Sequence, residues 1–311
     1  KELIALLERS KSFCFDTETT GIDAHQSELV GISFALKPGE AWFVFLPENY
    51  SECHSIVQEF KPLFENEKIE KTGQNLKYDI SMLKWYDVEV KGPLFDTMLA
   101  HYLVQPDLRH NMDFLAETYL HYKPVPIENL IGKKGKKQLT VRSVDPQVLK
   151  DYACEDADIT LQLRMALEPG LKEAAGMDLF NNIEVPLVPV LAAMEAEGVK
   201  LDIQALRDYS KQLEKEIAGI EKEIHGHAGV VFNIASPKQL GDILFEKLVI
   251  TDKPKKTKTG QYSTGEDILV RLINKHPVVQ MILDFRQLSK LKSTYVDPLP
   301  DMVNPRTGRI H

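Results

Sequence analysis

The stretch FCFDTETTGI, residues 13–22, places two acids directly behind an apolar run and decides how the first half of the chain folds. Phe13, Cys14 and Phe15 indicate a buried β-strand, since apolar and aromatic side chains fill the run. Asp16 and Glu18 follow at alternate positions, so their side chains point to the same side of that strand. Such a pair has two explanations: a strand end whose acids meet water or a helix N-terminus, or a site that uses both carboxylates.

Around this strand, strand and helix patterns alternate. Asp145 and Pro146 form a helix start signal, because Asp is a favoured N-cap and Pro fits the first helical position. The pattern predicts a mixed sheet flanked by helices that ends near residue 175. The predicted strands are 12–18, 28–36, 41–46 and a short one before residue 73, and KPGE (37–40) is a hairpin turn. The predicted helices are 53–64, 73–86, 95–104, 111–120 and one from 146.

The second half of the chain is almost wholly helical by its pattern. Leu206, Leu213 and Ile220 recur every seven residues, which is typical of a helix that packs along a second helix. This spacing predicts a long helix over 203–228 and an antiparallel partner over 277–296.

The composition is that of an ordinary soluble globular protein, with 311 residues, 43% hydrophobic and 27% charged. No apolar run approaches the ~20 residues needed to cross a bilayer, so no membrane partner is expected. The odd number of cysteines, without a CxxC pair, indicates reduced thiols. Because the first residue is Lys1, we expect a fragment of a longer protein.

The net charge of −8 argues weakly against a general nucleic-acid binder, although acids gathered around metal ions would also make the total negative. Three basic stretches are either solvated surface or tracks for phosphates. They are KKGKK (133–137), KPKKTK (253–258) and RQLSKLK (286–292).

Two further acids fall on predicted helices. Tyr152 and Asp156 stand four residues apart in YACED, so both reach the same spot, and Asp79 lies early in another helix. The alternative for Tyr152 and Asp156 is an exposed acidic face of the helix. Several packed carboxylates are costly unless cations balance them, and oxygen ligands favour Mg²⁺ or Mn²⁺. Pairs of such ions recur in phosphodiester cleavage.

The stretches FDTETTG, GQNLKYD and YACEDAD resemble the three exonuclease motifs of the proofreading domain of family A bacterial DNA polymerases, the DNA polymerase I family. That domain belongs to the tyrosine-containing branch of the DEDD superfamily and has a ribonuclease-H-like α/β fold. The later stretches GVKLD, FNIASPKQLGDILFEKL, LSKLKSTYVDPLP and NPRTGRIH resemble the joining segment and the thumb. The resemblance spans essentially the whole chain. It implies an exonuclease domain over 1–175 and a mostly α-helical linker and thumb-like region over 176–311.

By this resemblance, Asp16, Glu18 and Asp156 would ligate one divalent ion, and Asp16 and Asp79 would share a second. Tyr152 would orient the attacking water. The implied reaction is hydrolysis of the last phosphodiester at a DNA 3′ end, with release of a deoxynucleoside monophosphate.

The resemblance also implies contacts with DNA. Ile22 would wedge against the terminal base, as apolar side chains do on single strands. Five residues are candidates to hold the frayed strand, or else serve local capping and surface charge: Gln74, Asn75, Lys77, Tyr78 and Arg109. Four residues of the thumb would contact duplex phosphates: Lys290, Lys292, Ser293 and Thr294.

The implied parent is a DNA-directed DNA polymerase of replication and repair. The family continues into palm and fingers where this chain ends at His311, so we expect no polymerising activity here. We further expect a monomer in the bacterial cytoplasm, associated with the nucleoid. Two alternatives stay open: a ribonuclease-D-like exoribonuclease, which shares the catalytic residues, and a non-catalytic DNA-binding module.

Overall fold

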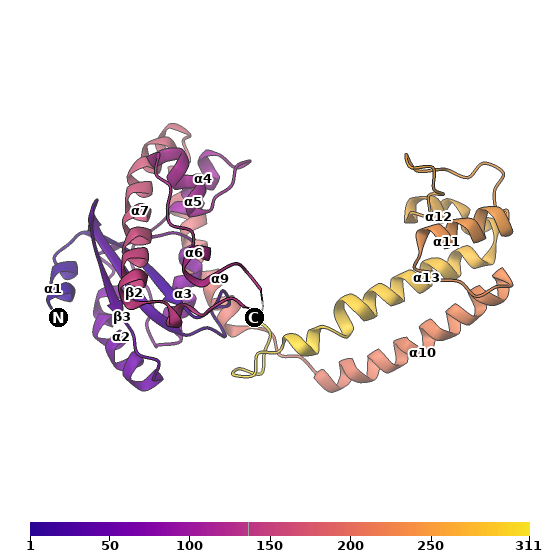
Figure 1. The fold of residues 1–311 in the computed structure, drawn as a ribbon, viewed down its shortest axis with the longest axis horizontal. Coiled ribbons are helices and arrows are strands. Elements are labelled where there is room, and N and C mark those ends of the chain that lie inside the picture. The colour runs from indigo at the N-terminus through magenta and orange to yellow at the C-terminus, as the bar shows by residue number, and fades with distance from the viewer. Residues whose placement is uncertain (136) are drawn as a thin grey trace. The chain divides into compact units, whose positions relative to one another are not determined.

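The computed structural model describes residues 1–135 and 137–311 and divides the chain into two compact units (Figure 1). The first unit comprises Lys1–Gly198 with His311, and the second comprises Val199–Ile310. Across the described residues, no helix combines the length and the apolar character needed to span a membrane. The predicted basic stretch 133–137 includes Lys136, which lies outside the described residues.

A five-stranded mixed sheet forms the centre of the first unit, with the strand order β3-β2-β1-β4-β5. β1 pairs antiparallel with β2 and parallel with β4, which confirms the predicted mixed sheet. β2 and β3 form the predicted hairpin through residues 37–40. The strands are β1 (Ser12–Thr19), β2 (Leu29–Lys37), β3 (Glu40–Phe45), β4 (Glu70–Gly73) and β5 (Leu94–Asp96).

Successive side chains of β1 point to opposite faces of the sheet, and each face is covered by a different helix. Phe13 and Phe15 pack against Phe64 of α2 (Tyr50–Phe64), with ring centroids 5.9 and 5.0 Å apart. Cys14 faces the other way and packs against Ala157 of α7 (Pro146–Glu173). Because side chains alternate along a strand, the even-numbered positions that follow Cys14 also face α7. Burial on both faces therefore fixes the direction in which the strand presents its acids.

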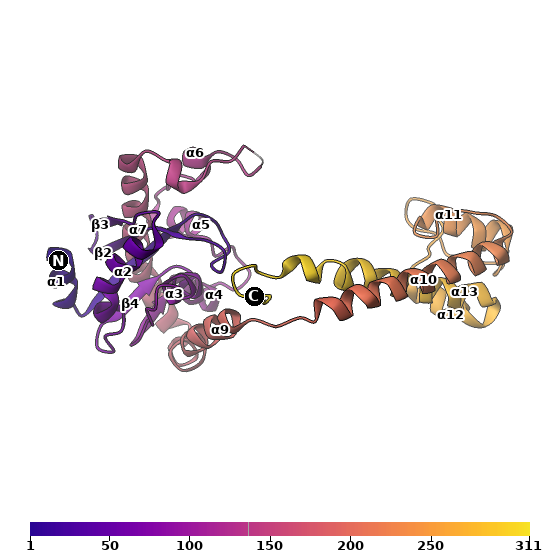
Figure 2. The same ribbon diagram turned by 90° about the horizontal axis from the view of Figure 1, so that it is seen from below.

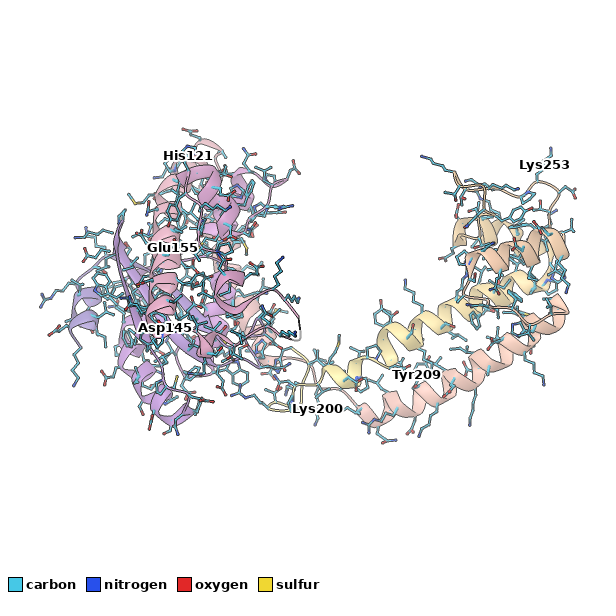
Figure 3. All side chains as sticks on the ribbon, viewed as in Figure 1. His121, Asp145, Glu155, Lys200, Tyr209 and Lys253 are labelled. Atoms are coloured by element: carbon cyan, nitrogen blue, oxygen red, sulfur yellow. The ribbon has the colours of Figure 1, made fainter. Side chains whose placement is uncertain are left out.

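The long helix α7 lies across β1, β2 and β3. Its N-cap is Asp145, whose carboxylate accepts hydrogen bonds from the backbone N–H of Gln147 at 2.9 Å and of Val148 at 3.2 Å. Asp145 marks the start of the helix in Figure 3, with Glu155 farther along it. The predicted start signal is thus confirmed.

The structure differs from the sequence prediction at residue 95, where a helix was expected. Leu94 pairs with Lys71 of β4, so this segment is a short strand, and α4 begins only at Thr97. The reason is Asp96, whose carboxylate caps α4 by accepting from the backbone N–H of Met98 at 2.9 Å. The remaining helices of the unit are α1 (Glu2–Glu8), α3 (Leu76–Lys84), α4 (Thr97–Val104), α5 (Met112–Leu115) with its π-helical continuation (Ala116–Leu120), α6 (Glu128–Ile131), α8 (Met177–Leu179) and α9 (Val185–Glu197).

The first unit extends beyond the boundary predicted near residue 175. Phe180, Val188 and Ala192 are buried in its main core, with the Phe180 ring 5.0 Å from that of Phe95. Removing these side chains from the core would expose large apolar surface, so residues 176–198 belong to the first unit rather than to the helical region.

The second unit is built on two long helices, α10 (Ile203–Ala228) and α13 (Pro277–Leu291), which run antiparallel and side by side (Figures 1 and 2). Of the three residues in the predicted seven-residue spacing, Leu213 is fully buried, whereas Leu206 and Ile220 are half-buried. Ile224, one helical turn after Ile220, is also fully buried. Ile224 packs with Leu269 and Val279 in the core of the unit. The shorter helices are α11 (Pro237–Asp242) and α12 (Glu266–Leu272), and residues Lys292–Val296 extend α13 as a π-helix.

Candidate active site

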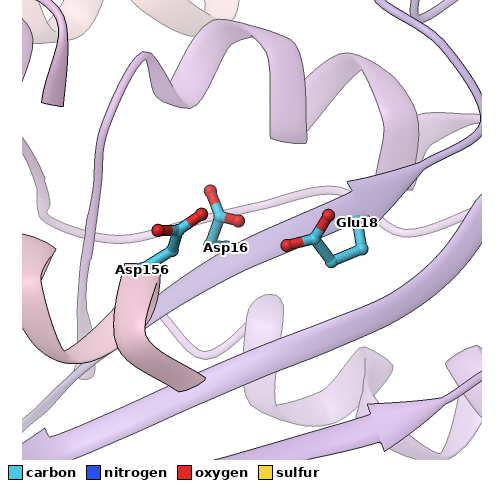
Figure 4. Close-up of side chains that lie close together, drawn as sticks. All are labelled: Asp16, Glu18 and Asp156. Carbon is cyan, nitrogen blue, oxygen red and sulfur yellow. The ribbon is translucent and has the colours of Figure 1, made fainter. Parts of the chain in front are cut away.

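Three carboxylates from two elements meet beside the sheet. One oxygen from each of Asp16, Glu18 and Asp156 lies within 4.8 Å of the others. Figure 4 shows the three side chains facing a common space between β1, which carries the first two, and α7, which carries the third. The two-residue spacing on the strand and the packing of α7 on the same face together bring these acids into one group.

Burial raises the free energy needed to ionise this acid group. Desolvation raises the pKa of Asp16 to about 7, and desolvation together with the nearby Asp16 charge raises the pKa of Glu18 to about 8. The pKa of Asp156 lies well above its usual value for the same two reasons. Among the described residues, Oε1 of Glu18 and Oδ1 of Asp156 are buried without a hydrogen-bond partner. Two buried, unsatisfied oxygens in a group of acids are the donors that a hard cation requires, so these residues fit a divalent metal ion.

Tyr152 lies one helical turn before Asp156 on α7, and both side chains line the same pocket. Burial, followed by the charges of the surrounding acids, raises the pKa of this phenol above its usual value. The hydroxyl therefore stays protonated at neutral pH and acts as a hydrogen-bonding group rather than as a base.

Asp79, the acid predicted from the stretch GQNLKYD, is held by the strand but does not belong to the acid group. Its Oδ1 accepts hydrogen bonds from the backbone N–H of Thr17 at 3.1 Å and from the Thr17 hydroxyl at 2.5 Å. Burial and then the Asp16 charge raise the pKa of Asp79 well above its usual value. Thr17 thus fixes this fourth carboxylate close enough to Asp16 to interact with it electrostatically.

The acid group opens into a pocket of about 570 Å³. Ile22 lies in its lining and is 90% exposed, which is compatible with the predicted contact to a base. One wall of the pocket comes from residues within 127–135 and 137–141, of which the sequence singled out only the basic stretch 133–137. The side chains of this wall are Ile127, Glu128, Ile131, Lys134, Gln138, Leu139 and Val141.

The other residues predicted to hold the frayed strand lie outside the described lining of this pocket. Gln74 donates from its side chain to the backbone carbonyl of His110 at 2.7 Å. Asn75 adopts a left-handed conformation with φ 60° at the start of α3, and its backbone N–H donates to Asp96 at 3.2 Å. Both residues serve local structure here, and their contact with DNA stays a prediction.

The remaining three candidates, Lys77, Tyr78 and Arg109, make different contacts within the protein. Lys77 forms an ion pair with Glu195 of α9 at 2.5 Å. The Tyr78 hydroxyl donates to the carbonyl of Gly21 at 2.5 Å and so braces the backbone next to the pocket mouth. Arg109 is exposed. Tyr78 is therefore connected to the pocket through the backbone that carries Ile22, whereas the roles of Lys77 and Arg109 toward DNA stay predictions.

In the second unit, one of the four predicted phosphate contacts is engaged within the protein. The Lys292 ammonium donates to Asp297 at 2.8 Å and to the Ser210 hydroxyl at 3.0 Å. The other three are exposed: Lys290, Ser293 and Thr294.

Comparison with known proteins agrees with the fold and the site. Residues 1–172 match the family described as 3'-5' exonuclease, and residues 203–311 match DNA polymerase family A. The chain is 42% identical to DNA polymerase I of Pseudomonas aeruginosa over 98% of its own length and 34% of the relative's. It is 38% identical to DNA polymerase I of Chloroflexus aurantiacus over 100% of its length and 34% of the relative's.

Among solved structures, the chain is similar to the POL domain of Pol1 from M. smegmatis in complex with DNA primer-template and dNTP. The TM-score is 0.79 at 27% identity, and the match covers 100% of this chain and 50% of that one.

The mixed sheet and the acid group at its central strand define an exonuclease domain of the ribonuclease-H-like class. Since more than half of its residues match that family, the chain belongs to the 3'-5' exonuclease family, and its helical unit matches DNA polymerase family A. The chain spans about a third of the length of the curated relatives that it matches.

Proposed function

We propose that the chain hydrolyses the terminal phosphodiester at DNA 3′ ends and releases deoxynucleoside monophosphates. The observation that carries this proposal is the group formed by Asp16, Glu18 and Asp156, with two buried oxygens that lack partners among the described residues. DNA as the substrate is supported by the relatives, which are named DNA polymerase I, and by the similar structure that contains a DNA primer-template.

Two divalent ions, Mg²⁺ or Mn²⁺, are the proposed cofactors. An all-carboxylate donor set suits hard cations with oxygen preference. Asp16, Glu18 and Asp156 would hold one ion, and Asp16 with Asp79 would hold the other. When bound, such ions lower the pKa of a water molecule and stabilise negative charge on phosphate oxygens. The raised pKa values of the acids supply a further reason, because ionised carboxylates this close together need positive charge between them.

Tyr152 is proposed to orient the attacking water molecule. It lies one helical turn before Asp156 on α7 and lines the same pocket as the acid group, so its hydroxyl can reach a water molecule held there. Because its pKa is raised, the phenol keeps its proton and contributes orientation rather than proton abstraction. Thr17 contributes by fixing Asp79 through two hydrogen bonds.

The second unit is proposed to act as a thumb that contacts duplex DNA. Lys290, Ser293 and Thr294 are exposed at the end of α13, where they can reach phosphates in a salt-sensitive, sequence-independent manner. Polymerisation of DNA is the activity that the names of the relatives suggest for a longer protein, and its use in replication and repair stays a prediction. The monomeric state and the cytoplasmic, nucleoid-associated location stay predictions.

Digestion of a 3′-labelled single-stranded DNA under a Mg²⁺ titration tests the proposal. Asp16→Ala should lower the rate roughly a thousandfold, because several kcal/mol of charge stabilisation are lost. Asp208→Ala, an exposed acid of the second unit, is the matched control and should leave the rate unchanged. Equal rates for wild type and Asp16→Ala would refute the site.

The same assay separates the alternatives. Digestion of single-stranded RNA at a rate comparable to that of DNA would favour the exoribonuclease. DNA binding without metal-dependent digestion would favour the non-catalytic module. The match of the second unit to DNA polymerase family A supports DNA over RNA as the substrate.

A further inference from the structure

The long helix α7, which carries Asp156, is bound to the sheet at a second point by Arg164. The Arg164 guanidinium forms an ion pair with the carboxylate of Glu70 on β4 and donates to the hydroxyl of Thr72 on the same strand at 3.0 Å. It also lies over the Phe95 ring of β5, 5.0 Å from the ring centroid. The Arg164 side chain is 19% exposed, so one guanidinium joins α7 to two strands in a largely shielded position.

Arg164 binds the sheet on the face that carries the acid group. Thr72 is paired with Cys14 in the parallel ladder between β4 and β1. Cys14 packs against α7, and paired residues of neighbouring strands point to the same face of a sheet. Asp16 lies two positions beyond Cys14, so its side chain is on this face too. The contact made by Arg164 is therefore one strand away from the acids and on their side of the sheet.

The distance between the two contact points of α7 is the same along the helix and along the strand. Arg164 follows Asp156 by eight residues, which corresponds to about 12 Å of α-helix. On β1, four residues separate the positions level with Arg164, at 12–14, from those of the strand acids, at 16–18, which corresponds to about 13 Å. A shift of α7 by one residue would move Asp156 by about 1.5 Å. The acid group, whose oxygens lie within 4.8 Å of one another, therefore depends on where Arg164 is bound.

The apolar contacts between α7 and the sheet near the acid group define this position less strictly. A small buried cluster there consists of Cys14, Ala35, Ala157 and Leu161. Packing of apolar side chains is not directional, whereas a guanidinium presents its donors in a planar fork of fixed geometry. The hydrogen bond from the Gly39 backbone N–H to Asp158 of α7, at 2.8 Å, is directional but lies in an exposed position. Arg164 thus supplies a directional contact that is shielded from water.

We propose that Arg164 is a positioning residue of the exonuclease site and holds α7 where Asp156 completes the acid group. This inference rests on the proposed function and extends it to a residue that lies outside both the acid group and the described pocket lining. Because Tyr152 is on the same helix, loss of Arg164 would displace Asp156 and Tyr152 together.

Calorimetric binding of Mn²⁺ to the full chain, without DNA, tests the position of the acids apart from catalysis. Arg164→Met removes the ion pair and the hydrogen bond, keeps a side chain of similar length, and should weaken Mn²⁺ binding about tenfold. Removal of a positive charge would by itself strengthen the binding of a cation, so a loss of affinity reports displaced ligands. Lys172→Ala removes an ion-paired lysine from the same helix and is the matched control, with the affinity of the wild type expected. Unchanged or tighter binding by Arg164→Met would overturn the proposal.

Arg164→Lys is a milder variant that keeps the positive charge. Its ammonium can pair with Glu70, but it lacks the planar fork that also binds Thr72. Mn²⁺ affinity should therefore fall about threefold, between the values of the wild type and Arg164→Met. An affinity equal to that of the wild type would overturn the proposal, whether or not Arg164→Met folds.

Steady-state kinetics with Mg²⁺ separate positioning from a general contribution to stability. In Arg164→Met, kcat for digestion of single-stranded DNA should fall about tenfold. KM should stay close to that of the wild type, because Arg164 lies outside the described pocket lining. A lower melting temperature with unchanged kcat and unchanged Mn²⁺ affinity would show that Arg164 only stabilises the fold, and the proposal would be wrong.

Failure of this inference is distinguishable from failure of the proposed function. If the wild type digests DNA and Arg164→Met matches it in Mn²⁺ affinity and kcat, the positioning role is wrong and the exonuclease stands. If Arg164→Met loses Mn²⁺ affinity but the wild type digests no DNA, the proposed activity is wrong and the positioning of the acid group stands.

Discussion

The first unit buries a group of acidic side chains beside its sheet, whereas the second unit has an apolar core and keeps the Lys292–Asp297 ion pair near the surface. Asp16, Glu18 and Asp156 lie within 4.8 Å of one another, and burial raises the pKa of all three. In the second unit, the Lys292–Asp297 ion pair is 22% and 44% exposed, and the main core is a cluster of apolar side chains. The two units are thus stabilised differently.

The difference shows where a residue serves the fold and where it serves chemistry. Buried acids without positive charge between them destabilise the folded state, so their presence is explained by a ligand rather than by stability. An apolar seam such as that of α10 stabilises the unit by itself, and exposed ion pairs add little. Substitutions at the acid group of the first unit should therefore lower activity, whereas substitutions in the apolar core of the second unit should lower stability.

The largest effect on stability is expected for Ile224→Ala in the second unit. Ile224 is fully buried between α10 and the Leu269–Val279 core, so the cavity should lower the free energy of unfolding by about 2–5 kcal/mol. Thermal unfolding followed by circular dichroism measures this loss. Val231→Ala, which truncates an 80% exposed side chain, is the control. Digestion of single strands should survive Ile224→Ala, and its loss would show that the two units are not independent.

Tyr152→Phe should have the opposite profile, with a loss of activity and little change in stability. Loss of the orienting hydroxyl is expected to lower the rate of digestion roughly a hundredfold. Metal affinity, measured by calorimetry, should stay close to that of the wild type, because the three carboxylates remain. Loss of metal binding equal to that of Asp16→Ala would contradict separate roles for the phenol and the acids.

A pH titration of stability should detect the buried acids directly. The folded-state pKa values of Asp16, about 7, and Glu18, about 8, exceed the ordinary values, so the folded state binds more protons than the unfolded state. Their stabilisation is complete below the ordinary carboxyl pKa and is lost as pH rises through 7 and 8. In EDTA the first unit should lose several kcal/mol between pH 5 and pH 8.

Two controls sharpen this titration. Mg²⁺ should raise the melting temperature more at pH 8 than at pH 5, since it balances the ionised acids. Glu18→Gln should flatten the pH dependence in EDTA. Stability that rises between pH 5 and pH 8 in EDTA would show that these acids are not strained by burial.

Periodic features of the chain were predictable, whereas features set by tertiary contacts were not. The seven-residue spacing from Leu206 predicted the bounds of α10, and Asp145 predicted the start of α7, because both signals are local. The strand at Leu94 was missed because its pairing with β4 is not encoded in a three-residue pattern. Residues 176–198 were assigned to the wrong unit, since helical periodicity does not state which core a helix joins.

The same distinction holds for the site. Asp16, Glu18 and Asp156 were predictable because β-strand alternation and helical spacing restrict where each carboxylate points. The position of Leu139 in the pocket lining was not predictable, because it depends on the backbone hydrogen bond to Ile131 and on the packing of Ile131 against Val30 of β2. The binding of Asp79 by Thr17 likewise joins residues that no sequence spacing relates.

The smallest effects should separate two lysines that are two positions apart at the end of α13. Lys290 is exposed, whereas Lys292 is bonded to Asp297 and Ser210 and lowers the pKa of Asp297 by its hydrogen bond. Lys290→Ala should reduce the salt dependence of duplex binding by about one phosphate contact, with stability unchanged. Lys292→Ala should cost at most about 1 kcal/mol of stability and affect the salt dependence less, because its charge is already paired. Anisotropy titrations with a labelled duplex at several salt concentrations measure both slopes. If both variants reduced the salt-dependence slope equally, DNA would displace the Asp297 carboxylate from Lys292. The surface lysines of the second unit would then serve ligand binding, as the acid group of the first unit does.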